Sequence, residues 1–448
     1  MKLTAMRCVG LGACLALASC VGDRPTGSAD AARVLAQQTL AIEAADVVDP
    51  TRWTIDACVA SALAHSPRVR EALARVGVAE ADWSLTVLPR EPEIAASALF
   101  PVGGGDPELE ASLALDLIDL LRIPARRDVA DAALRAAIFD VARECVALAR
   151  EAQDAFVRAL AADETVIARG HIARLAREFA DALAAQVEAG TERASQAESA
   201  RLLAIEAELA HDAARVEARV ARRALAQRVG IEGDGRDLVL EPFEPAGPIE
   251  ASPELIDAAL ERRLDIRAQE QRVLEARAAV ELAGGVLPAL EVGAGVLRPE
   301  RPEGEERGPT RVGPSLSVPL PWFGRSAARI AAAEAQLALR VAQLETARAE
   351  AKRELQDQSD RQSQAFTEWR RRERELEPKA RELAERARVA AQAGQLAWTE
   401  AHAARVVARE AMLALVESRR RARTTDIATR GLKPAQPKVE PTTADSNP

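Results

Sequence analysis

The sequence of 448 residues contains no tyrosine, and aromatic residues make up only 3% of it. This excludes a core of bulky aromatic side chains and favours long helices that pack through small ones. Lysine and arginine number 60 against 69 aspartates and glutamates, a net charge of -9, so no basic surplus is available to bind nucleic acid. Beyond residue 20 no run of about 18 uncharged apolar residues occurs, which excludes a transporter built from membrane-spanning helices.

Motifs of catalysis and metal binding are also lacking. The sequence has no nucleophile elbow, phosphate loop, paired-cysteine motif or zinc spacing, and its four histidines are scattered: His65, His171, His211 and His402. We therefore predict no enzymatic activity, no cofactor and no metal site. Cys58 and Cys145 lie among apolar residues at helical spacing, which favours buried free thiols; a disulfide between them is the alternative.

The amino terminus has the pattern of a lipoprotein signal. Lys2 and Arg7 precede an apolar stretch over residues 9–18, and small residues lead to Cys20. We predict a signal peptide over residues 1–19, with Cys20 as the first mature residue, carrying acyl chains that include palmitate. An ordinary signal peptide with an incidental Cys20 is the alternative. Residues 20–50 are interpreted as a linker.

An internal repeat divides the rest of the chain. Residues 62–70 align with residues 259–267, and each is followed by a helical run, a Leu-Pro pair, two alternating segments and a very long helical run. We predict two copies of one unit, residues 51–229 and 252–423. Residues 230–251 would connect them, and the polar, Pro-rich residues 424–448 would form a disordered tail.

Four segments alternate between apolar and polar residues, as strands do. In the run from Pro107, Leu113 falls on an apolar side and Ser112 on a polar side. The other three segments are residues 94–100, 290–296 and 312–320. Such strands suit a soluble sheet or a barrel between lipid and water, and alternation alone favours the soluble sheet.

The long helical runs have the pattern of coiled coils. From Arg126 to Ala189 small and apolar residues recur at alternating spacings of three and four: Ile138, Val141, Cys145, Leu148, Ala152, Ala155 and Ala159. A turn near Gly190 and a return helix ending near Val229 complete a hairpin. The second copy repeats this plan with a turn at Gly394, a return helix ending near Arg423, and a kink at Pro378.

These features together resemble the outer-membrane efflux protein (TolC) family, in its lipid-anchored branch. The resemblance covers about residues 50–423, and it rests on the paired segments 66–70 and 263–267, the Leu-Pro pairs, residues 315–324, and the tips at residues 188–191 and 392–395. It implies a mainly α chain with a small β part, in which antiparallel coiled-coil hairpins accompany two β-hairpins. Four strands cannot close a barrel, but three chains supply twelve, so a trimeric 12-stranded barrel with a periplasmic helical tunnel is expected.

The resemblance also implies a function and a set of sites. The chain would be an outer-membrane channel of a tripartite efflux or secretion system, a passive duct that meets a periplasmic adaptor and an inner-membrane transporter. The implied adaptor-docking tips are Gly190, Thr191, Gly394 and Gln395, and Glu400 is the implied entrance ring; an ordinary solvated charge is the alternative for Glu400. A homotrimer lipid-anchored in the outer membrane and reaching into the periplasm is expected, and a lipid-anchored periplasmic scaffold without a pore is the alternative.

Overall fold

A computed structural model describes residues 27–40, 52–100, 105–235, 237–284, 289–299, 301–302, 308–319 and 324–430. The described chain is mainly helical, with one four-stranded sheet. Cys20, residues 287–288 and residues 320–323, on which parts of the sequence analysis depend, lie outside the described residues.

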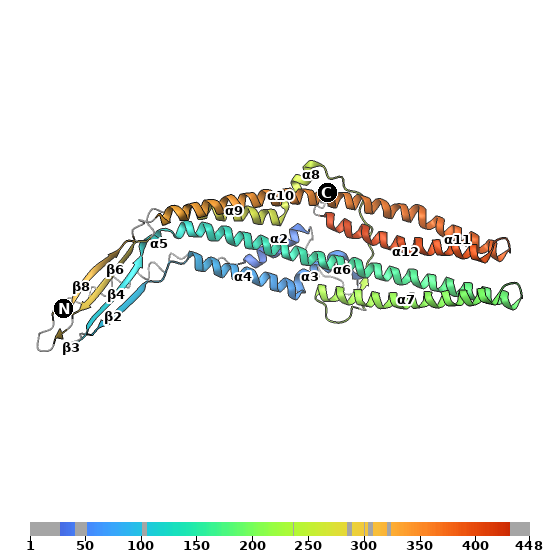
Figure 1. Cartoon of the computed structure of the whole chain (residues 1–448), viewed down its shortest axis with the longest axis horizontal. Helices are drawn as coiled ribbons and strands as arrows, with labels where there is room; N and C mark the ends of the chain where they lie inside the picture. Colours follow the sequence, from blue (N-terminus) through green and yellow to red (C-terminus); the bar gives the residue numbers. More distant parts are fainter. Residues whose placement is uncertain are drawn as a thin grey trace, which may run out of the picture. The chain divides into compact units, whose positions relative to one another are not determined.

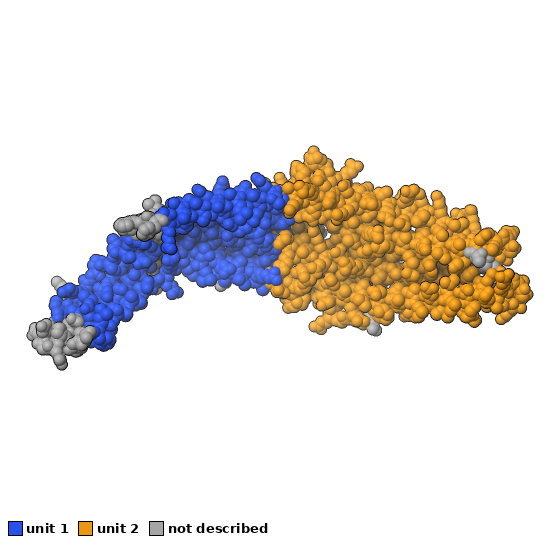
Figure 2. Space-filling view, viewed as in Figure 1, with its two compact units in different colours: residues 1–32, 74–141, 264–347 blue, residues 33–73, 142–263, 348–448 orange. Residues whose placement is uncertain are grey.

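The chain forms two compact units, which Figure 2 shows in different colours. Unit 1 comprises residues 1–32, 74–141 and 264–347, and unit 2 comprises residues 33–73, 142–263 and 348–448. Each unit therefore takes segments from both predicted copies. The helices α4, α6 and α10, whose bounds follow below, contribute residues to both units.

The two copies begin with the same pair of short helices. Helices α3 (Ile55–His65) and α4 (Pro67–Val87) correspond to α8 (Pro253–Arg262) and α9 (Leu264–Ala283). The chain leaves each first helix at an aligned residue in extended conformation, Ser66 with ψ 127° and Arg263 with ψ 124°. The pairing of these segments, predicted from the sequence repeat, is thus reproduced by the backbone.

Both copies also begin with a side-chain cap. The hydroxyl of Thr54 accepts a hydrogen bond from the backbone N–H of Ala57 at 3.1 Å, and Ser252 accepts one from Leu255 at 3.3 Å. These contacts satisfy N–H groups that lack a partner in the first turn. Thr54 and Ser252 are therefore the N-caps of α3 and α8.

The predicted strands all form, and they lie in unit 1. They are β2 (Glu93–Leu99), β4 (Glu108–Asp116), β6 (Glu291–Arg298) and β8 (Arg311–Ser317). They pair antiparallel in the order β2-β4-β6-β8, so β2 and β8 are the two edges (Figure 1). Because β4 pairs with β6, the two copies share one sheet.

Two further strand pairs are too short to be recognised from alternation. Strand β1 (Arg52–Trp53) runs parallel to β5 (Val239–Leu240), and β3 (Gly105–Asp106) pairs antiparallel with β7 (Arg301–Pro302).

Asp116 fixes the end of the sheet where the long helices begin. Its carboxylate caps the short helix α5 (Leu117–Leu121) by accepting from the N–H groups of Ile118 and Asp119, and it accepts a third hydrogen bond from the N–H of Leu290 at 3.1 Å. One side chain of the first copy thereby holds the start of β6 in the second.

Each copy continues into a long helical hairpin. The first consists of α6 (Ile123–Glu188) and α7 (Ala194–Val229). The second consists of α10 (Arg325–Arg371), a π-helical turn (Arg372–Leu376), α11 (Glu377–Gln392) and α12 (Trp398–Thr429). Figure 1 shows α7 returning along α6 and α12 returning along α11. The predicted seam residues of α6 from Val141 onward are buried, as close packing through small side chains requires.

Two boundaries differ from the sequence analysis. Helix α12 continues to Thr429, and Ile427 is buried, so residues 424–429 are not part of a disordered tail. These residues are polar, but a helix accommodates them because the hydroxyls of Thr425 and Thr429 donate hydrogen bonds to backbone carbonyls of the preceding helical turn. The linker predicted over residues 20–50 contains helix α2 (Ser28–Thr39), in which Ala32 and Ala36 are buried.

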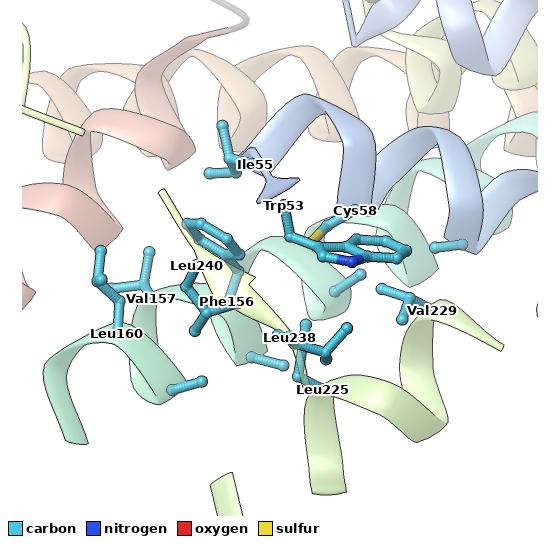
Figure 3. Close-up of a cluster of buried hydrophobic side chains, with 14 of the residues drawn as sticks. Trp53, Ile55, Cys58, Phe156, Val157, Leu160, Leu225, Val229, Leu238 and Leu240 are labelled. Carbon is cyan, nitrogen blue, oxygen red and sulfur yellow. The ribbon is translucent and has the colours of Figure 1, made fainter. Parts of the chain in front are cut away.

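The main core of unit 2 gathers side chains from the first copy, the connecting segment and the end of α12. Figure 3 shows Trp53 and Cys58 of the first copy among Phe156 of α6, Val229 of α7 and Leu240 of the connecting segment. Both Cys58 and Cys145 are buried free thiols, as the helical spacing predicts. Burial raises the pKa of Cys58 to about 12 and that of Cys145 to about 11, so both stay protonated at neutral pH.

Candidate functional site

The first candidate site is the sheet, whose register separates two chemically distinct faces. Leu113 pairs with Ile94 and Ala294, whereas its neighbour Ser112 pairs with Ala95 and Gly295. Extending this pairing over all four strands collects one apolar face, which consists of Ile94, Ala96, Ala98, Leu109, Ala111, Leu113, Leu115, Val292, Ala294, Val296, Val312, Pro314 and Leu316, with Arg298 at one end. We call this set the apolar face.

The opposite face of the sheet is polar or small. It carries Glu93, Ala95, Ser97, Leu99, Glu108, Glu110, Ser112, Ala114, Asp116, Glu291, Gly293, Gly295, Leu297, Arg311, Gly313, Ser315 and Ser317. One of its glycines has a steric reason, because a Cβ at Gly293 would lie 2.5 Å from the carbonyl oxygen of Leu113 and 2.6 Å from the hydroxyl of Ser315. We call this set the polar face.

The apolar face is exposed in the single chain. Ile94 is 77% exposed, Val312 72% and Leu316 69%. A soluble sheet of this kind covers its apolar side with helices, whereas a contiguous exposed apolar surface marks contact with lipid or with another protein. The soluble sheet that alternation alone favours therefore does not fit these strands.

The second candidate site is formed by the tips of the two hairpins, which have the same backbone geometry. Gly190 and Gly394 adopt left-handed conformations, with φ of 73° and 72°. The N–H of Thr191 bonds to the carbonyl of Gln186 at 3.0 Å, and the N–H of Gln395 bonds to the carbonyl of Ala390 at 2.9 Å. A Cβ would meet nothing at either glycine, so the positive φ is the reason for glycine there.

A groove of about 400 Å³ runs between α6 and α7 beside the first tip. Alanines line its floor, among them Ala180, Ala184, Ala197 and Ala204. Charged side chains border it: Arg177 donates to Glu208 through Nε at 2.8 Å, and Glu188, Glu198 and Arg201 are close by. A shallow floor between charged borders can accept a helix or a helical turn from a partner.

Near the tips the two hairpins touch through a small cluster. Most of its members are alanines: Ala180, Ala200, Ala204, Ala387, Ala391, Ala401 and Ala404, with Leu183. The larger contact is made by Phe179 of α6, whose ring stacks on His402 and lies 4.5 Å below the guanidinium of Arg405, which also bonds to the carbonyl of Leu175. Burial and the neighbouring Arg405 lower the pKa of His402.

Sequence reasoning missed this aromatic contact. The scattered histidines of the sequence give no indication of this, but His402 is partly buried against Phe179. The available signal was a phenylalanine close to the predicted tip in a chain with very few aromatic residues.

Glu400 lies in the first turn of α12, and its side chain is exposed. Ala403, one turn further along, is also exposed and carries no acid, so Glu400 is the acid of the first turn of α12. Within the part of the chain that the structure describes, no three His, Cys, Asp or Glu side chains are grouped to hold a metal ion. No described helix has an apolar stretch long enough to cross a bilayer.

One family model matches part of the chain. Residues 255–432 match the model of a family described as outer membrane efflux protein. No curated protein sequence matches the chain.

Solved structures of similar fold extend the comparison to most of the chain. The crystal structure of CusC, described in connection with transmembrane channel formation, is similar with a TM-score of 0.71 and 18% sequence identity. The alignment covers 84% of this chain and 91% of the CusC chain. The outer membrane protein VceC of Vibrio cholerae has a TM-score of 0.68 at 20% identity, with coverages of 84% and 95%. The MtrE outer membrane channel of Neisseria gonorrhoeae has a TM-score of 0.64 at 17% identity, with coverages of 87% and 94%.

Proposed function

Because this chain carries an outer membrane efflux protein domain in the fold of outer-membrane channels, we propose that it is the outer-membrane duct of a tripartite efflux or secretion system. It lets substrates pass and catalyses no reaction, in keeping with the family match. The duct is a homotrimer in which three sheets close one barrel and the long hairpins form a tunnel below it. Residues 51–229 and 252–423 are the two repeats of each protomer.

The observation that carries this proposal is the apolar face with its two open edges. Four strands cannot close a barrel, and unpaired N–H and C=O groups of an edge are not tolerated in lipid. The order β2-β4-β6-β8 is antiparallel throughout, so β8 of one chain and β2 of the next can pair antiparallel as well. Three chains then give twelve strands, with the apolar face toward lipid and the polar face toward water.

A second apolar surface, on α7 of unit 2, supports assembly. Helix α7 packs on its own chain through Ala200, Ala204, Ala214 and Ala218. On its opposite side an exposed stripe follows a coiled-coil spacing, and it consists of Leu202, Ile205, Leu209, Val216 and Val220. We call this set the α7 stripe. A helix with one seam inside the chain and a second seam exposed fits a position between two protomers.

The α7 stripe gives a direct test of assembly. We expect Leu209→Glu to reduce the association constant of the trimer by about tenfold or more for each interface between protomers. The reason is that an apolar contact worth about 2 kcal/mol is replaced by a charge. Ser199→Glu is the matched control, since it adds the same carboxylate to the exposed surface of α7 away from the stripe. Mass measurement of the detergent-solubilised assembly reports the outcome. Equal trimer content in both variants would exclude the stripe as an interface.

Lipid, adaptor and pump complete the proposed system. Cys20 carries the acyl chains and sits in the outer membrane, and the hairpins extend into the periplasm. The tips at Gly190, Thr191, Gly394 and Gln395, with the groove between α6 and α7, receive the adaptor. The shared backbone geometry of the two tips supports this role, since six similar turns would then surround the lower end of the tunnel in a trimer.

Glu400 is proposed to line the entrance, where three copies would attract cations. We expect Glu400→Gln to weaken block by multivalent cations several-fold in planar-bilayer conductance. Glu385→Gln is the control: that carboxylate lies on α11 and already accepts hydrogen bonds from Arg388 at 2.6 and 2.9 Å, which lower its pKa. If neither substitution changes the block by multivalent cations, Glu400 does not line the entrance and is an ordinary surface charge.

A further inference from the structure

Helix α12 of unit 2 contacts both α6 and α10, and the connecting segment covers one side of this group of helices. Gln362 of α10 is fully buried and accepts a hydrogen bond from the N–H of Ile249 at 3.1 Å. Arg423 of α12 is 1% exposed, donates through Nε to the carbonyl of Phe243 at 2.9 Å, and bonds to Glu164 of α6 at 2.8 Å. This side is therefore closed to a ligand.

The other side of α6 is open. Phe156 and Leu160 of α6 pack in the core of unit 2 with Leu240 of the connecting segment. Arg158 lies two residues from each of them, which places it about 200° around the helix, and its side chain is exposed. The group of helices thus has a covered side and an open side.

Two grooves meet on the open side. One has a volume of about 460 Å³ and lies between α6 and α12. The other has a volume of about 350 Å³ and lies between α12 and α10. Arg420 lines both grooves, so they adjoin. We call the larger one, between α6 and α12, the arginine groove.

Arginine exceeds acid around these grooves, although the chain as a whole has a net charge of -9. The charged residues that line them are Arg158, Arg169, Arg361, Arg420 and Arg421, against Glu368 and Glu417. Glu417 is already bonded to Arg420, at 2.7 and 2.8 Å, and to Arg421 at 3.1 Å. A local positive charge therefore remains after these pairs are formed.

Three of the arginines are not used inside the chain. Arg158, Arg169 and Arg361 form no hydrogen bond or ion pair with the residues that the structure describes. The nearby Asp154 does not neutralise them, because four arginines act on its charge: Arg150, Arg158, Arg228 and Arg420. Burial raises the pKa of Asp154, while these arginines lower it. Guanidinium groups without a carboxylate of their own can bind the anionic group of a ligand.

The floor of the arginine groove is apolar. Ala161 and Ala162 of α6 and Leu413 and Val416 of α12 line it. Its volume is in the range of sites that hold small molecules, about 300–1,000 Å³. An apolar floor beside free guanidinium groups fits a ligand that combines an apolar body with a carboxylate or sulfonate.

The connecting segment indicates which side of these helices can face the tunnel of the proposed duct. One side of a tunnel wall faces the passage and the other faces the periplasm. Three copies of the connecting segment on the inner side would occupy the space that a duct must keep free. The open side is the one that leaves a passage.

We propose that the open side of α6 and α12 lines the tunnel, and that the arginine groove binds the transported molecules, which are small organic anions with an apolar body. The inference rests on the proposed duct and names its substrate class. Arg158, Arg169 and Arg420 contact the anionic group, and Leu413 and Val416 contact the apolar body. Because the groove is open, it holds such a molecule weakly enough to release it, as passage requires.

Three probes with the same ring test the arginine groove in the full-length trimer: 2-naphthoate, the neutral 2-naphthalenemethanol and the cationic 2-naphthylmethylammonium. Equilibrium dialysis measures their binding. We expect the wild type to bind 2-naphthoate about tenfold or more tightly than the ammonium probe. Arg158→Gln and Arg169→Gln should each weaken 2-naphthoate about five- to tenfold and leave the neutral probe unchanged, since each removes one charge-assisted hydrogen bond.

Two further variants separate the charge from the apolar floor and from general effects. Leu413→Ala should weaken all three probes to a similar extent, because it removes contact with the ring alone. Arg262→Gln is the matched control. Arg262 is an exposed arginine of α8 in the same unit, outside the groove, and it donates to the carbonyl of Ala258 in its own helix. Its replacement should change no affinity.

The reversal potential in a KCl gradient across a planar bilayer tests whether the groove faces the tunnel. Arg158→Gln and Arg169→Gln should each shift the selectivity of the trimer toward cations, because each removes three positive charges from the wall. Arg262→Gln should leave the reversal potential unchanged.

The anion site would be overturned if the wild type binds the anionic and cationic probes equally, or if neither arginine substitution weakens 2-naphthoate. Binding that depends on the arginines without any shift in reversal potential would place the groove outside the tunnel and overturn the substrate class. Conductance of the wild-type trimer separates the two proposals. A conducting trimer that does not prefer 2-naphthoate refutes the anion site alone, whereas a trimer that binds 2-naphthoate but does not conduct refutes the duct.

Discussion

Leu113→Arg is expected to abolish stable assembly, whereas Ser112→Arg is expected to assemble nearly as the wild type does. The two residues are neighbours in β4, but the register places them on the apolar and the polar face. An arginine that faces lipid near the bilayer centre costs about 2–4 kcal/mol, and a trimer incurs this cost three times. On the polar face, an arginine at position 112 meets Ala95 and Gly295 on the neighbouring strands, which leave room for it.

Detergent-resistant trimer in membrane fractions is the measurement for this pair. The substitutions introduce the same side chain into the same strand, so each controls for the general effect of arginine on strand formation. Loss of trimer in Leu113→Arg alone supports a barrel. Equal tolerance of both variants would instead favour the lipid-anchored scaffold, whose strands would have no lipid-facing side.

Cys20→Ala is expected to remove all incorporated palmitate, because Cys20 is the only cysteine at the proposed lipoprotein cleavage site. Stable anchoring by lipid requires more than one acyl chain, which an acylated amino-terminal cysteine provides through both its sulfur and its amine. The barrel should nevertheless keep the variant in the membrane, since the apolar face is independent of the anchor.

Radiolabelled palmitate with the purified chain measures this effect, and Cys58→Ala is the control. Cys58 is fully buried in the core of unit 2, so its replacement should leave the label unchanged. Label that persists in Cys20→Ala would refute the lipoprotein assignment.

Val21 follows Cys20, and by the sorting rules of such proteins this favours the outer membrane. Recovery of the wild type only with the inner membrane would contradict that placement.

Features that depend on neighbouring residues were predictable from the sequence. The caps at Thr54 and Ser252 and the tip glycines Gly190 and Gly394 each follow from one side chain or one backbone conformation. The correspondence of residues 62–70 with residues 259–267 followed from the repeat, whereas the helix breaks at Ser66 and Arg263 are seen only in the structure. The existence of four strands followed from alternation, because a period of two identifies a strand wherever it lies.

Features that depend on distant residues were not predictable. Gln362 bonds to a segment more than 110 residues away, and Arg423 bonds to Glu164 across 259 residues. No local pattern marks such partners. The end of α12 was placed too early for the same reason, since Ile427 belongs to a core supplied by Trp53 and Phe156.

The two faces of the sheet were only partly predictable from the sequence. Alternation along β4 defines two sides, but only the register with β2, β6 and β8 shows that apolar residues of all four strands share one face. Exposure then shows that no described helix covers this face. We therefore propose a barrel rather than a soluble sheet from the strand pairing and the burial, which alternation does not contain.

Single-channel conductance of the purified full-length chain across a planar lipid bilayer tests the central claim most directly. The account predicts discrete, reproducible steps from the trimer, since three copies of the sheet enclose a water-filled lumen lined by the polar face. The Leu113→Arg chain, which should not assemble, should give no steps under the same conditions. A wild-type chain that is trimeric and membrane-bound yet shows no steps would contradict the duct.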